Sequence, residues 1–428
     1  MPSSPQVYLT LVWVIIFVWE DLSLLVLLFL VVVWGLSGLD RIRFGIIGTG
    51  ARGSHYGFLL SREYREDAEV VALCDSNPIR LRNVREMLGL NAKLFTDYRD
   101  LLALDDVDAV IITTPDYTHA EIAIASLEAG KDVLCEKPIA TTVKGCREVL
   151  DAVKRSDRTF MTGFVLRYNR VFSTIKKMVS EGEIGSLKLV TSIDNRQGAD
   201  YFRRWHRFRK NSGGLLVHKS CHSLDVINWV VDSEPVRVSA FGGNDVYVPG
   251  KWRGERCLTC KWKRECPEYI DLRSPRLSKL YLEPEKFDGY IRDVCVWTSE
   301  KDTCDNATVI IEYANGVRAT YTLCLFTPYT SRQMSFIGDG GKLEVDEAKR
   351  QIILYPNYSS DVKTQKIGEE RGGHGGGDMG LINDFLTAIR EGKKPLASAE
   401  AGSLSVLLGL AAIKSIREGR TIELKEME

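Results

Sequence analysis

The sequence lacks an excess of charge of either sign. Its 428 residues include 57 Lys plus Arg and 57 Asp plus Glu, so the formal net charge is zero. A domain that binds nucleic acid needs a basic surface to neutralise the phosphates. We therefore expect no nucleic acid partner, in a chain long enough for two domains that each have a core.

The N-terminal region lacks two features of a secretory signal peptide, which begins with basic residues and ends at a small-residue cleavage site. No Lys or Arg precedes Arg41, and no alanine precedes Ala51. What is present is an apolar run over residues 22–39, just long enough for one membrane span. Arg41 and Arg43 after this run would keep the rest of the chain on the cytoplasmic side.

Residues 1–40 therefore form an apolar N-terminal extension that has three interpretations. It is a membrane anchor, an artefact of a wrongly chosen start codon, or a helix that is buried or covered by a partner. Against an anchor, only two residues separate Leu39 from the first predicted strand, which leaves almost no linker between bilayer and sheet. We expect a cytoplasmic protein whose only membrane contact would be through this extension.

The sequence also lacks the cysteine pattern of a disulfide-stabilised scaffold. Half of its ten cysteines fall singly in apolar or mixed segments, at positions 74, 135, 146, 221 and 324. Such cysteines usually behave as small buried hydrophobic residues. A reducing compartment fits this distribution best.

A second group of cysteines lies in a basic, Trp-containing insertion at about residues 250–296. The spacing Cys257-x2-Cys260, followed by Cys266 and Cys295, is that of a tetrahedral thiolate site, with Cys304 as a reserve ligand. The insertion has little apolar material, so a structural zinc would explain how it folds; an iron–sulfur cluster uses the same ligands. The alternatives are free thiols or one disulfide.

A glycine-rich turn follows the first predicted strand, residues 42–47, which is almost entirely apolar. The turn has the spacing Gly48-x-Gly50-x-x-Gly53. In this pattern the first glycine makes the tight turn, the second lets a pyrophosphate approach, and the third lets the next helix pack closely. We predict a dinucleotide site that includes Thr49, Ala51 and Arg52, the alternative being an ordinary glycine-rich turn.

The next predicted strand, residues 69–74, ends at Asp75. An acidic residue at this distance from the glycines usually accepts a hydrogen bond from the adenosine ribose. Because its carboxylate would repel a 2′-phosphate, we predict NAD as the cofactor. Arg80 and Arg82 lie close enough in sequence to keep NADP as the alternative.

Two rhythms of apolar residues divide the rest of the chain. Up to residue 164, short strands alternate with amphipathic helices, which predicts a Rossmann domain over residues 41–164 with a doubly wound parallel sheet. Its strands are predicted at residues 42–47, 69–74, 109–113, 132–135 and 159–164, and its helices at 53–63, 77–88, 119–129 and 142–155.

After Tyr168 the alternating runs become longer, which predicts a second α+β domain over residues 165–428. We expect it to contain a large, open and mostly antiparallel sheet, with Asn315-Gly316 as a hairpin turn. Two helices, residues 380–391 and 399–418, close the chain. The segment 371–378, RGGHGGGD, is too rich in glycine for regular structure and predicts a loop that closely approaches another group.

Four motifs carry a resemblance to a known family. They are TTPDYTH at residues 113–119, CEKP at 135–138, GGLLVHKSCHSLD at 213–225, and AEAGS at 399–403 with Lys414-Ser415. Together they resemble the glucose–fructose oxidoreductase, inositol dehydrogenase and rhizopine-catabolism (Gfo/Idh/MocA) family. The resemblance covers residues 41–428, and Glu-Lys-Pro is its most specific part.

The resemblance implies roles for several residues around a nicotinamide cofactor. Thr114, Pro115 and His119 would line it near the nicotinamide ribose. Glu136 and Lys137 would lie beside the nicotinamide and the reacting carbon, before a proline whose peptide bond is often cis in the family. A homodimer or homotetramer is also implied.

The resemblance further implies that His222 is catalytic. It also identifies a departure, because many members have an aspartate four residues earlier, where this chain has His218. A helix would place the two histidines on one face, with Asp225 on the same side to orient the imidazole. The alternatives are a metal site built on the two histidines, or a structural role for both.

The chemistry implied is the oxidation of a secondary alcohol, which requires a base for the hydroxyl proton while nicotinamide takes the hydride. His222 has a suitable pKa, and Lys137 would stabilise the developing alkoxide. Further residues are predicted to contact the substrate because aromatic, Arg and His side chains together are typical of polyol recognition. They are Arg167, Tyr168, Trp205, His206, Arg207 and, more weakly, His374.

The sequence thus predicts an NAD(P)-dependent oxidoreductase acting on a sugar, sugar derivative or polyol. One alternative is a glycosidase or epimerase that oxidises its substrate only transiently with tightly bound NAD. The other is a non-catalytic ligand sensor, which the presence of both Lys137 and His222 disfavours.

Overall fold

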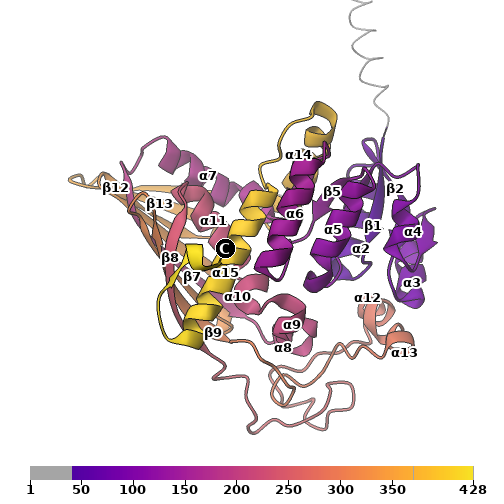
Figure 1. Ribbon diagram of the computed structural model, residues 1–428. Helices are drawn as coiled ribbons and strands as arrows, with labels where there is room; N and C mark the ends of the chain where they lie inside the picture. Colours follow the sequence, from indigo (N-terminus) through magenta and orange to yellow (C-terminus); the bar gives the residue numbers. More distant parts are fainter. Residues whose placement is uncertain (1–40, 370, 428) are drawn as a thin grey trace, which may run out of the picture.

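The computed structural model describes residues 41–369 and 371–427. The predictions for residues 1–40 lie outside the described residues. The described chain forms two sheets with helices packed around them (Figure 1). The first sheet is six-stranded and parallel, and the second is nine-stranded and mostly antiparallel, as the sequence predicts.

The first sheet has the strand order β3-β2-β1-β4-β5-β6, with every neighbouring pair parallel. The order reverses between β1 and β4, and ligands of such sheets bind at this switch point, beyond the carboxyl ends of the strands. The strands are β1 (Ile42–Ile47), β2 (Ala68–Cys74), β3 (Lys93–Phe95), β4 (Ala109–Ile112), β5 (Asp132–Cys135) and β6 (Phe160–Thr162). The sequence did not predict β3, because a three-residue edge strand has too little alternation to detect.

Helices cover both faces of this sheet and begin at caps that the sequence supplies. Asn77 accepts from the amides of Ile79 and Arg80, and Thr142 accepts from that of Gly145, as the preference for polar N-caps predicts. The helices are α2 (Ala51–Arg62), α3 (Pro78–Leu88), α4 (Tyr98–Leu102), α5 (His119–Glu128) and α6 (Val143–Arg155).

The second sheet has the order β14-β13-β12-β11-β7-β10-β9-β8-β15, and only β7 and β10 pair in parallel among its described strands. Asn315 and Gly316 form the turn between β9 and β10, and Gly316 has a φ of 81°, as the hairpin prediction requires. The strands are β7 (Leu187–Gln197), β8 (Pro235–Gly243), β9 (Asn306–Tyr313), β10 (Arg318–Cys324), β11 (Phe326–Gly338), β12 (Gly341–Asp346), β13 (Gln351–Pro356), β14 (Lys363–Lys366) and β15 (Ile422–Glu423).

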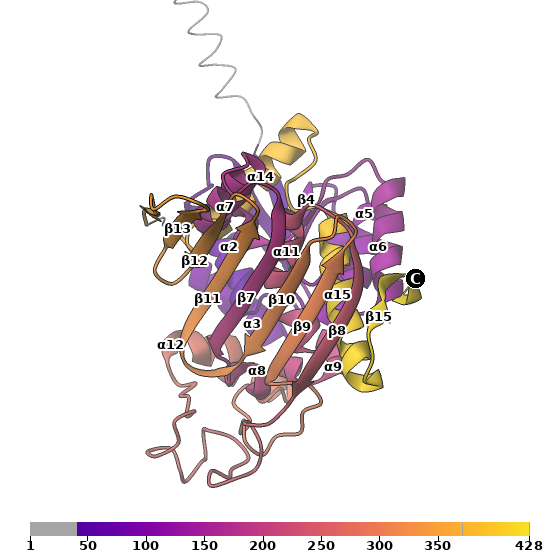
Figure 2. The same ribbon diagram turned by 90° about the vertical axis from the view of Figure 1, so that its left-hand side faces the viewer.

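Helices pack on one face of this sheet and leave the other face open (Figure 2). The long ones are α7 (Arg170–Ser180), α11 (Cys221–Val231) and α15 (Ala399–Glu418). Helix α14 (Gly377–Glu391) lies instead against the first domain, where the ring of Phe385 is 6.2 Å from that of Phe44 in β1 and Arg390 pairs with Asp67. Helix α15 is long and apolar enough to span a membrane, but half of its apolar window is buried within the protein. It contacts α6, α11 and β8, as a core helix of a globular domain does.

The predicted insertion lies between β8 and β9. It is mostly irregular and contains three short helical segments, α12 (Pro275–Leu277), η4 (Ser278–Leu282) and α13 (Glu285–Asp288). These segments return to the first domain and lie beside α3 (Figure 1). The insertion therefore connects the two domains at a place remote from their sequence junction.

Candidate active site

The predicted cofactor residues lie in the segments that follow successive strands of the parallel sheet. Gly48 follows β1, Asp75 follows β2, Thr113 follows β4 and Glu136 follows β5. Parallel strands end at the same edge of a sheet, so these residues gather around one crevice. The topology therefore brings together motifs that are far apart in sequence.

The glycine turn has the geometry that a pyrophosphate requires. Gly48 has a φ of +93°, and a Cβ there would lie 2.7 Å from the amide nitrogen of Thr114. A Cβ on Gly53 would overlap the carbonyl oxygen of Gly48, whereas one on Gly50 would meet no atom within 4 Å. The open space over Gly50, at the start of α2, fits the close approach of a phosphate to a helix N-terminus.

Asp75 is fully hydrogen-bonded. Its Oδ2 accepts from the amide and hydroxyl of Thr49 at 2.8 and 3.0 Å, and its Oδ1 accepts from the amide of Asn77 at 2.9 Å. Arg80 Nη1 also donates to Oδ1 at 2.9 Å. The guanidinium beside the carboxylate reduces the repulsion that would exclude NADP, so Asp75 alone does not select the cofactor.

His119 ties two of the loops together. It is buried, with Nδ1 2.7 Å from the carbonyl oxygen of Pro138 and Nε2 2.9 Å from that of Thr114. Its ring therefore holds the segments after β4 and β5 at a fixed spacing. Each ring nitrogen of His119 lies beside a carbonyl oxygen. His119 therefore holds the two segments in place and has no ring nitrogen left to contact a ligand.

Glu136 and Lys137 lie at the centre of the crevice, before a cis Lys137–Pro138 peptide bond. Glu136 accepts hydrogen bonds from Arg52 and from the hydroxyl of Tyr56. Burial alone would raise the pKa of Glu136, but Arg52 and Lys137 hold it below its usual value. Lys137 Nζ donates to the carbonyl oxygen of His218 at 2.9 Å, which brings the ammonium group to the second domain.

His222 lies at the start of α11 with its Nδ1 buried and without a hydrogen-bond partner. Burial lowers its pKa well below the usual value, and the nearby Lys137 lowers it further. A neutral imidazole can accept a proton. The ring centroids of Phe164 and His374 lie 6.3 and 6.4 Å away, so His222 faces the same crevice.

Two details of the predicted histidine helix are wrong. α10 (Leu215–His218) ends at His218 and α11 begins at Cys221, so the two histidines do not share one continuous helix. Asp225 does not orient His222, because its carboxylate accepts from Arg167 Nε and Nη2 at 2.9 and 2.7 Å. A buried guanidinium requires such a partner, and this requirement determines where Asp225 points.

His218 obtains a carboxylate partner from the first domain. Its Nδ1 lies 2.6 Å from Oδ2 of Asp116, in η1 (Asp116–Thr118), and both side chains are buried. Burial raises the pKa of Asp116 and lowers the pKa of His218, which favours a pair of zero net charge. The sequence analysis did not select Asp116, although it lies within the TTPDYTH motif.

Two of the residues predicted after α8 (Asp200–Arg203) join this cluster. The His206 ring lies 4.2 Å from that of His218, and Trp205 lies 5.5 Å from it. His206 Nδ1 is buried without a partner, and burial lowers its pKa. Arg207 instead donates to the carbonyl oxygen of Arg204 and lies over the ring of Phe208, so the prediction that it reaches the substrate has no support.

Arg167 and Tyr168 have structural partners. In addition to Asp225, Arg167 donates to the carbonyl oxygen of Leu396 at 2.8 Å. The hydroxyl of Tyr168 donates to Asp384 in α14 at 2.6 Å. Both side chains attach η2 (Val165–Tyr168), the segment after β6, to later parts of the chain, which leaves the expectation that they bind substrate without support.

Lys219 is buried. Its Nζ lies 3.0 Å from Asp194 Oδ2, and burial lowers its pKa to about 8 despite this carboxylate. Arg332 also reaches Asp194, at 3.4 Å. The cluster joins the turn between α10 and α11 to β7 and β11, so Lys219 is neither solvent-exposed nor free to bind substrate.

The glycine-rich loop places His374 near His222. His374 has a positive φ of 52° and lies 3.1 Å from Oδ2 of Asp378, the same oxygen that His55 approaches at 3.1 Å. Arg52 Nη2 lies 2.7 Å from the other oxygen of Asp378. Burial would raise the pKa of Asp378, but the hydrogen bonds from His374 and His55 and the charge of Arg52 hold it well below its usual value. The sequence did not indicate Asp378, whose partners come from both domains.

Cys257, Cys260, Cys266 and Cys295 line one small pocket in the insertion. Nevertheless, within residues 41–369 and 371–427 no group of three or more His, Cys, Asp or Glu side chains is arranged to hold a metal ion. All four are free thiols. The prediction of a structural zinc therefore has no support from the geometry.

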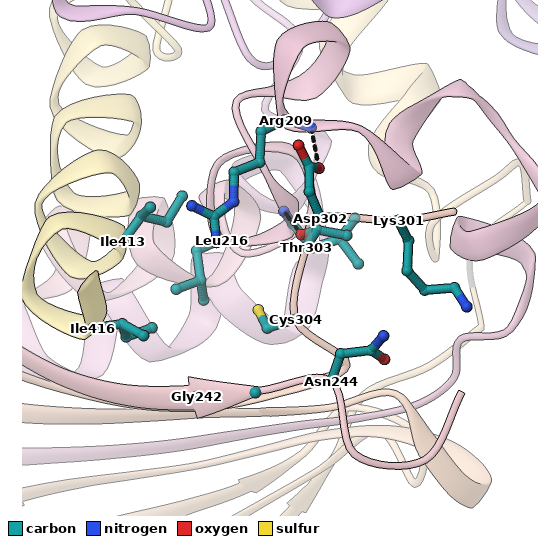
Figure 3. Close-up of a pocket in the computed structure, with 12 residues that line it drawn as sticks. Arg209, Leu216, Gly242, Asn244, Lys301, Asp302, Thr303, Cys304, Ile413 and Ile416 are labelled. Carbon is teal, nitrogen blue, oxygen red and sulfur yellow. Dashed lines mark hydrogen bonds between the residues drawn. The ribbon is translucent and has the colours of Figure 1, made fainter. Parts of the chain in front are cut away.

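A larger pocket, of about 230 Å³, lies elsewhere, between α15 and the end of β8 (Figure 3). Arg209, Asn244 and Lys301 line it on the polar side, and Ile413 and Ile416 on the apolar side. Cys304, the reserve ligand of the sequence analysis, also lies here, apart from the other four cysteines. The pocket includes none of the predicted catalytic residues.

Comparison with known proteins supports the same division of the chain. Residues 42–164 match the model of an oxidoreductase family with an NAD-binding Rossmann fold, Gfo/Idh/MocA, and residues 176–424 match the C-terminal alpha/beta domain of that family. YteT of Bacillus subtilis (strain 168) is 31% identical over 408 residues, which cover 86% of this chain and 94% of YteT. The myo-inositol 2-dehydrogenase of Thermotoga maritima is 25% identical over 390 residues, covering 90% and 99%.

Solved structures share the fold. A levoglucosan dehydrogenase in complex with NADH and levoglucosan superposes with a TM-score of 0.71 at 20% identity, covering 90% of this chain and all of the other. An oxidoreductase domain protein from Kribbella flavida also has a TM-score of 0.71, at 21% identity and with 90% and 99% coverage. Both sheets and their order along the chain are therefore those of known proteins.

Proposed function

Because the chain belongs to the Gfo/Idh/MocA family of NAD-binding oxidoreductases, we propose that it transfers a hydride between nicotinamide and a secondary hydroxyl of a sugar, sugar derivative or polyol. The observation that carries the proposal is the convergence of two groups from different domains. Lys137 reaches the carbonyl oxygen of His218, four residues before the unpartnered imidazole of His222. A cation and a neutral base at one crevice are what alcohol oxidation requires.

In this proposal each group has one task. His222 accepts the hydroxyl proton of the substrate, since its lowered pKa keeps the ring unprotonated near neutral pH. Lys137 donates a hydrogen bond to the same oxygen and stabilises the negative charge that develops there. NAD, when bound, supplies the hydride acceptor. The glycine turn would hold its pyrophosphate.

The Asp116–His218 pair has a positioning role in the proposal. The carbonyl oxygen of His218 holds Lys137, and the ring of His218 is fixed by Asp116. The carboxylate that many relatives have on the histidine helix is thus supplied from η1 in the other domain. His218 Nε2 is left to contact a substrate hydroxyl.

A hydroxyl-rich substrate fits the side chains around the crevice. Trp205 offers an apolar ring face, while His206, His218 and His374 offer ring nitrogens that donate or accept hydrogen bonds. Sugars and polyols combine such apolar faces with many hydroxyls. The names of the inositol and levoglucosan dehydrogenases among the similar proteins point to the same class.

The test is a panel of sugars and polyols, screened for NADH formation with the wild type and two variants. We expect Lys137→Ala and His222→Ala each to lower kcat by about 10²- to 10⁴-fold. Lys144→Ala is the matched control, because the Lys144 side chain is largely exposed and pairs only with Glu148 on its own helix. Full activity in both site variants would contradict the assignment of the two groups.

Other reactions remain within reach of the same site. An enzyme that keeps NAD bound would cleave or epimerise a glycoside through a transient ketone, releasing product without net NADH. An aryl glycoside with catalytic NAD distinguishes this reaction, since the aglycone would accumulate. A ligand sensor would reduce no NAD with any polyol.

Cofactor choice is proposed as NAD over NADP. The family model carries the NAD-binding description, and Asp75 follows β2, where an acidic residue usually accepts a hydrogen bond from the ribose. Because Arg80 neutralises Asp75, we expect the preference to be modest. Titration with both reduced nucleotides measures it, and tighter binding of NADPH would contradict it.

We also propose a homodimer or homotetramer formed through the open face of the second sheet. Leu189, Ile193, Ile310 and Phe241 project from its strands with exposed side chains. An apolar sheet face of this kind is commonly covered by a partner. Light scattering of the purified protein gives the assembly size, and a monomer would contradict the proposal.

We also propose membrane attachment and a structural zinc, each with a separate test. Membrane attachment through residues 1–40, on an otherwise cytoplasmic protein, is tested by fractionating cells that express the full chain or residues 41–428. Structural zinc is tested by metal analysis of the purified protein, with Cys257→Ser as the comparison. Recovery of metal-free, fully folded protein would contradict the zinc prediction.

A further inference from the structure

The insertion of the second domain reaches the cofactor end of the first domain. Its segments α12, η4 and α13, residues 275–288, lie against α3, the helix that follows the ribose-binding position (Figure 1). Leu280 in this segment is fully buried, so the contact is part of the core. We call residues 275–288 the strap.

Three polar side chains of the first domain hold the strap. Asn83 Nδ2 donates to the carbonyl oxygen of Lys279 at 2.8 Å and to Glu283 at 3.0 Å. Asn77 donates to the carbonyl oxygen of Pro284 and to the carboxylate of Asp288. Arg80 donates to the carbonyl oxygen of Leu280 and to the same carboxylate. These bonds hold the strap against α3 and the segment before it.

The strap also touches the glycine turn. The hydroxyl of Tyr281 accepts a hydrogen bond from the amide of Ala51 at 3.2 Å. Ala51 is the first residue of α2, and its amide is one of the groups that a pyrophosphate would meet at this helix N-terminus. The Tyr281 side chain is only 8% exposed, with Arg292 over its ring. Its hydroxyl is therefore held at the phosphate position.

One guanidinium joins the strap to the ribose position. Arg80 donates through Nη1 to Asp75 at 2.9 Å and through Nη2 to Asp288 of the strap at 3.1 Å. Farther along, Arg256 pairs with Glu285 of the strap and with Asp293. The strap is thus anchored at both ends, to the cofactor crevice and to the rest of the insertion.

We propose that the strap closes the adenosine and pyrophosphate end of the dinucleotide site and contributes Tyr281 to it, so that bound NAD(H) exchanges slowly. This inference rests on the proposed nucleotide site. When the pyrophosphate takes the Ala51 amide, the Tyr281 hydroxyl becomes free to donate to a phosphate oxygen, since a phenol both donates and accepts. Release of the nucleotide then requires the strap to leave α3.

A slowly exchanging cofactor has a chemical consequence. An enzyme that retains its nicotinamide after hydride transfer forms bound NADH before it releases free NADH. The strap therefore predicts that nucleotide release limits the rate at which free NADH accumulates in the substrate screen.

Release of bound NADH measures the effect directly. Protein loaded with NADH is mixed with excess NAD in a stopped-flow instrument, and the loss of NADH fluorescence gives the release rate. We expect Asn83→Ala, which loses only contacts to the strap, to release NADH about fivefold faster or more. Tyr281→Phe, which keeps the ring, should release it about tenfold faster because a hydrogen bond to a charged group is lost.

The matched control is Asn357→Ala. Asn357 donates to the carbonyl oxygen of Asp339 in an exposed turn of the second sheet, far along the chain from the strap. We expect wild-type release from this variant. Thermal melting of all variants confirms that each is folded.

The outcomes separate the strap from the function on which it rests. Wild-type release rates in both Asn83→Ala and Tyr281→Phe would overturn the strap while leaving the nucleotide site intact. A wild type that binds neither NADH nor NADPH would overturn the proposed function, and the strap would fall with it. Faster NADH release in Asn83→Ala and Tyr281→Phe, with wild-type release in Asn357→Ala, supports the inference.

Discussion

Asp116 and His218 meet across the domain boundary, with Oδ2 of the carboxyl group 2.6 Å from Nδ1 of the imidazole. The two residues belong to different domains, in η1 and α10, and are 102 positions apart in the chain. The carbonyl oxygen of the same histidine holds Lys137. A contact between the two domains therefore fixes the residue whose carbonyl group accepts from Lys137.

The first prediction concerns this pair. Asp116→Asn keeps the size of the side chain but changes its hydrogen bonding, so His218 and the Lys137 contact should shift. We expect kcat to fall by about 100-fold, because small displacements of reacting groups have effects of that size. NADH affinity should stay at the wild-type value. Asp157→Asn, at a side chain 92% exposed, is the control, and unchanged kcat in Asp116→Asn would remove the positioning role.

The second prediction separates two glycines of the turn. Gly50→Ala adds a methyl group in open space, so the free protein should fold normally but bind NADH at least about tenfold more weakly, because the methyl group occupies the phosphate approach. Gly53→Ala would overlap the carbonyl oxygen of Gly48, so it should lower the melting temperature itself. Fluorescence titration and thermal melting check both. Tight NADH binding by Gly50→Ala would contradict the placement of the pyrophosphate.

The third prediction concerns the buried pair of Arg167 and Asp225. Removing the carboxylate in Asp225→Ala leaves a buried guanidinium without its partner, and such losses cost about 3–5 kcal/mol of unfolding free energy. Denaturant unfolding of the purified variant measures the change. Glu66→Gln, in the exposed Arg65–Glu66 pair, should leave the midpoint unchanged. Equal midpoints for Asp225→Ala and the wild type would show that the pair contributes no stability.

The fourth prediction is a pH dependence of stability. Burial lowers the pKa values of His206 and His222 in the folded state, whereas the unfolded chain protonates both near pH 6.5. The unfolded state therefore binds more protons below that pH, so stability is complete above it and falls as the pH falls. At pH 5 each of the two histidines should lower the free energy of unfolding by about 2 kcal/mol relative to neutral pH.

Melting temperatures between pH 5 and pH 8 test the sign. His206→Gln should make the melting temperature fall less steeply with decreasing pH, since one titrating group is removed. A melting temperature that rises on acidification from pH 7 to pH 5 would contradict the neutral buried histidines.

The sequence predicted the features that depend on local pattern. The glycine turn and the Asn315-Gly316 hairpin each follow from the conformational preferences of neighbouring residues, and the structure has both. The resemblance added the cis bond before Pro138, which no periodicity could indicate.

Features that depend on distant partners were beyond the sequence. Asp225 was expected to serve His222 because the two are close in the chain, but Arg167 takes its carboxylate from another element. Asp378 contacts side chains of α2 and of its own loop. The hydroxyl of Tyr281 accepts a hydrogen bond from the amide of Ala51, 230 positions away. Such pairings depend on how the two domains pack, and the spacing of residues along the chain does not predict that packing.

Arg52 lies between Glu136 and Asp378, and so joins the Glu-Lys-Pro segment after β5 to the loop that carries His374. One guanidinium balances two buried carboxylates that belong to different halves of the molecule. Remodelling the glycine-rich loop to admit another sugar would redistribute that charge. Substrate preference and cofactor geometry are therefore coupled traits in this enzyme, and evolution or engineering would have to change them together.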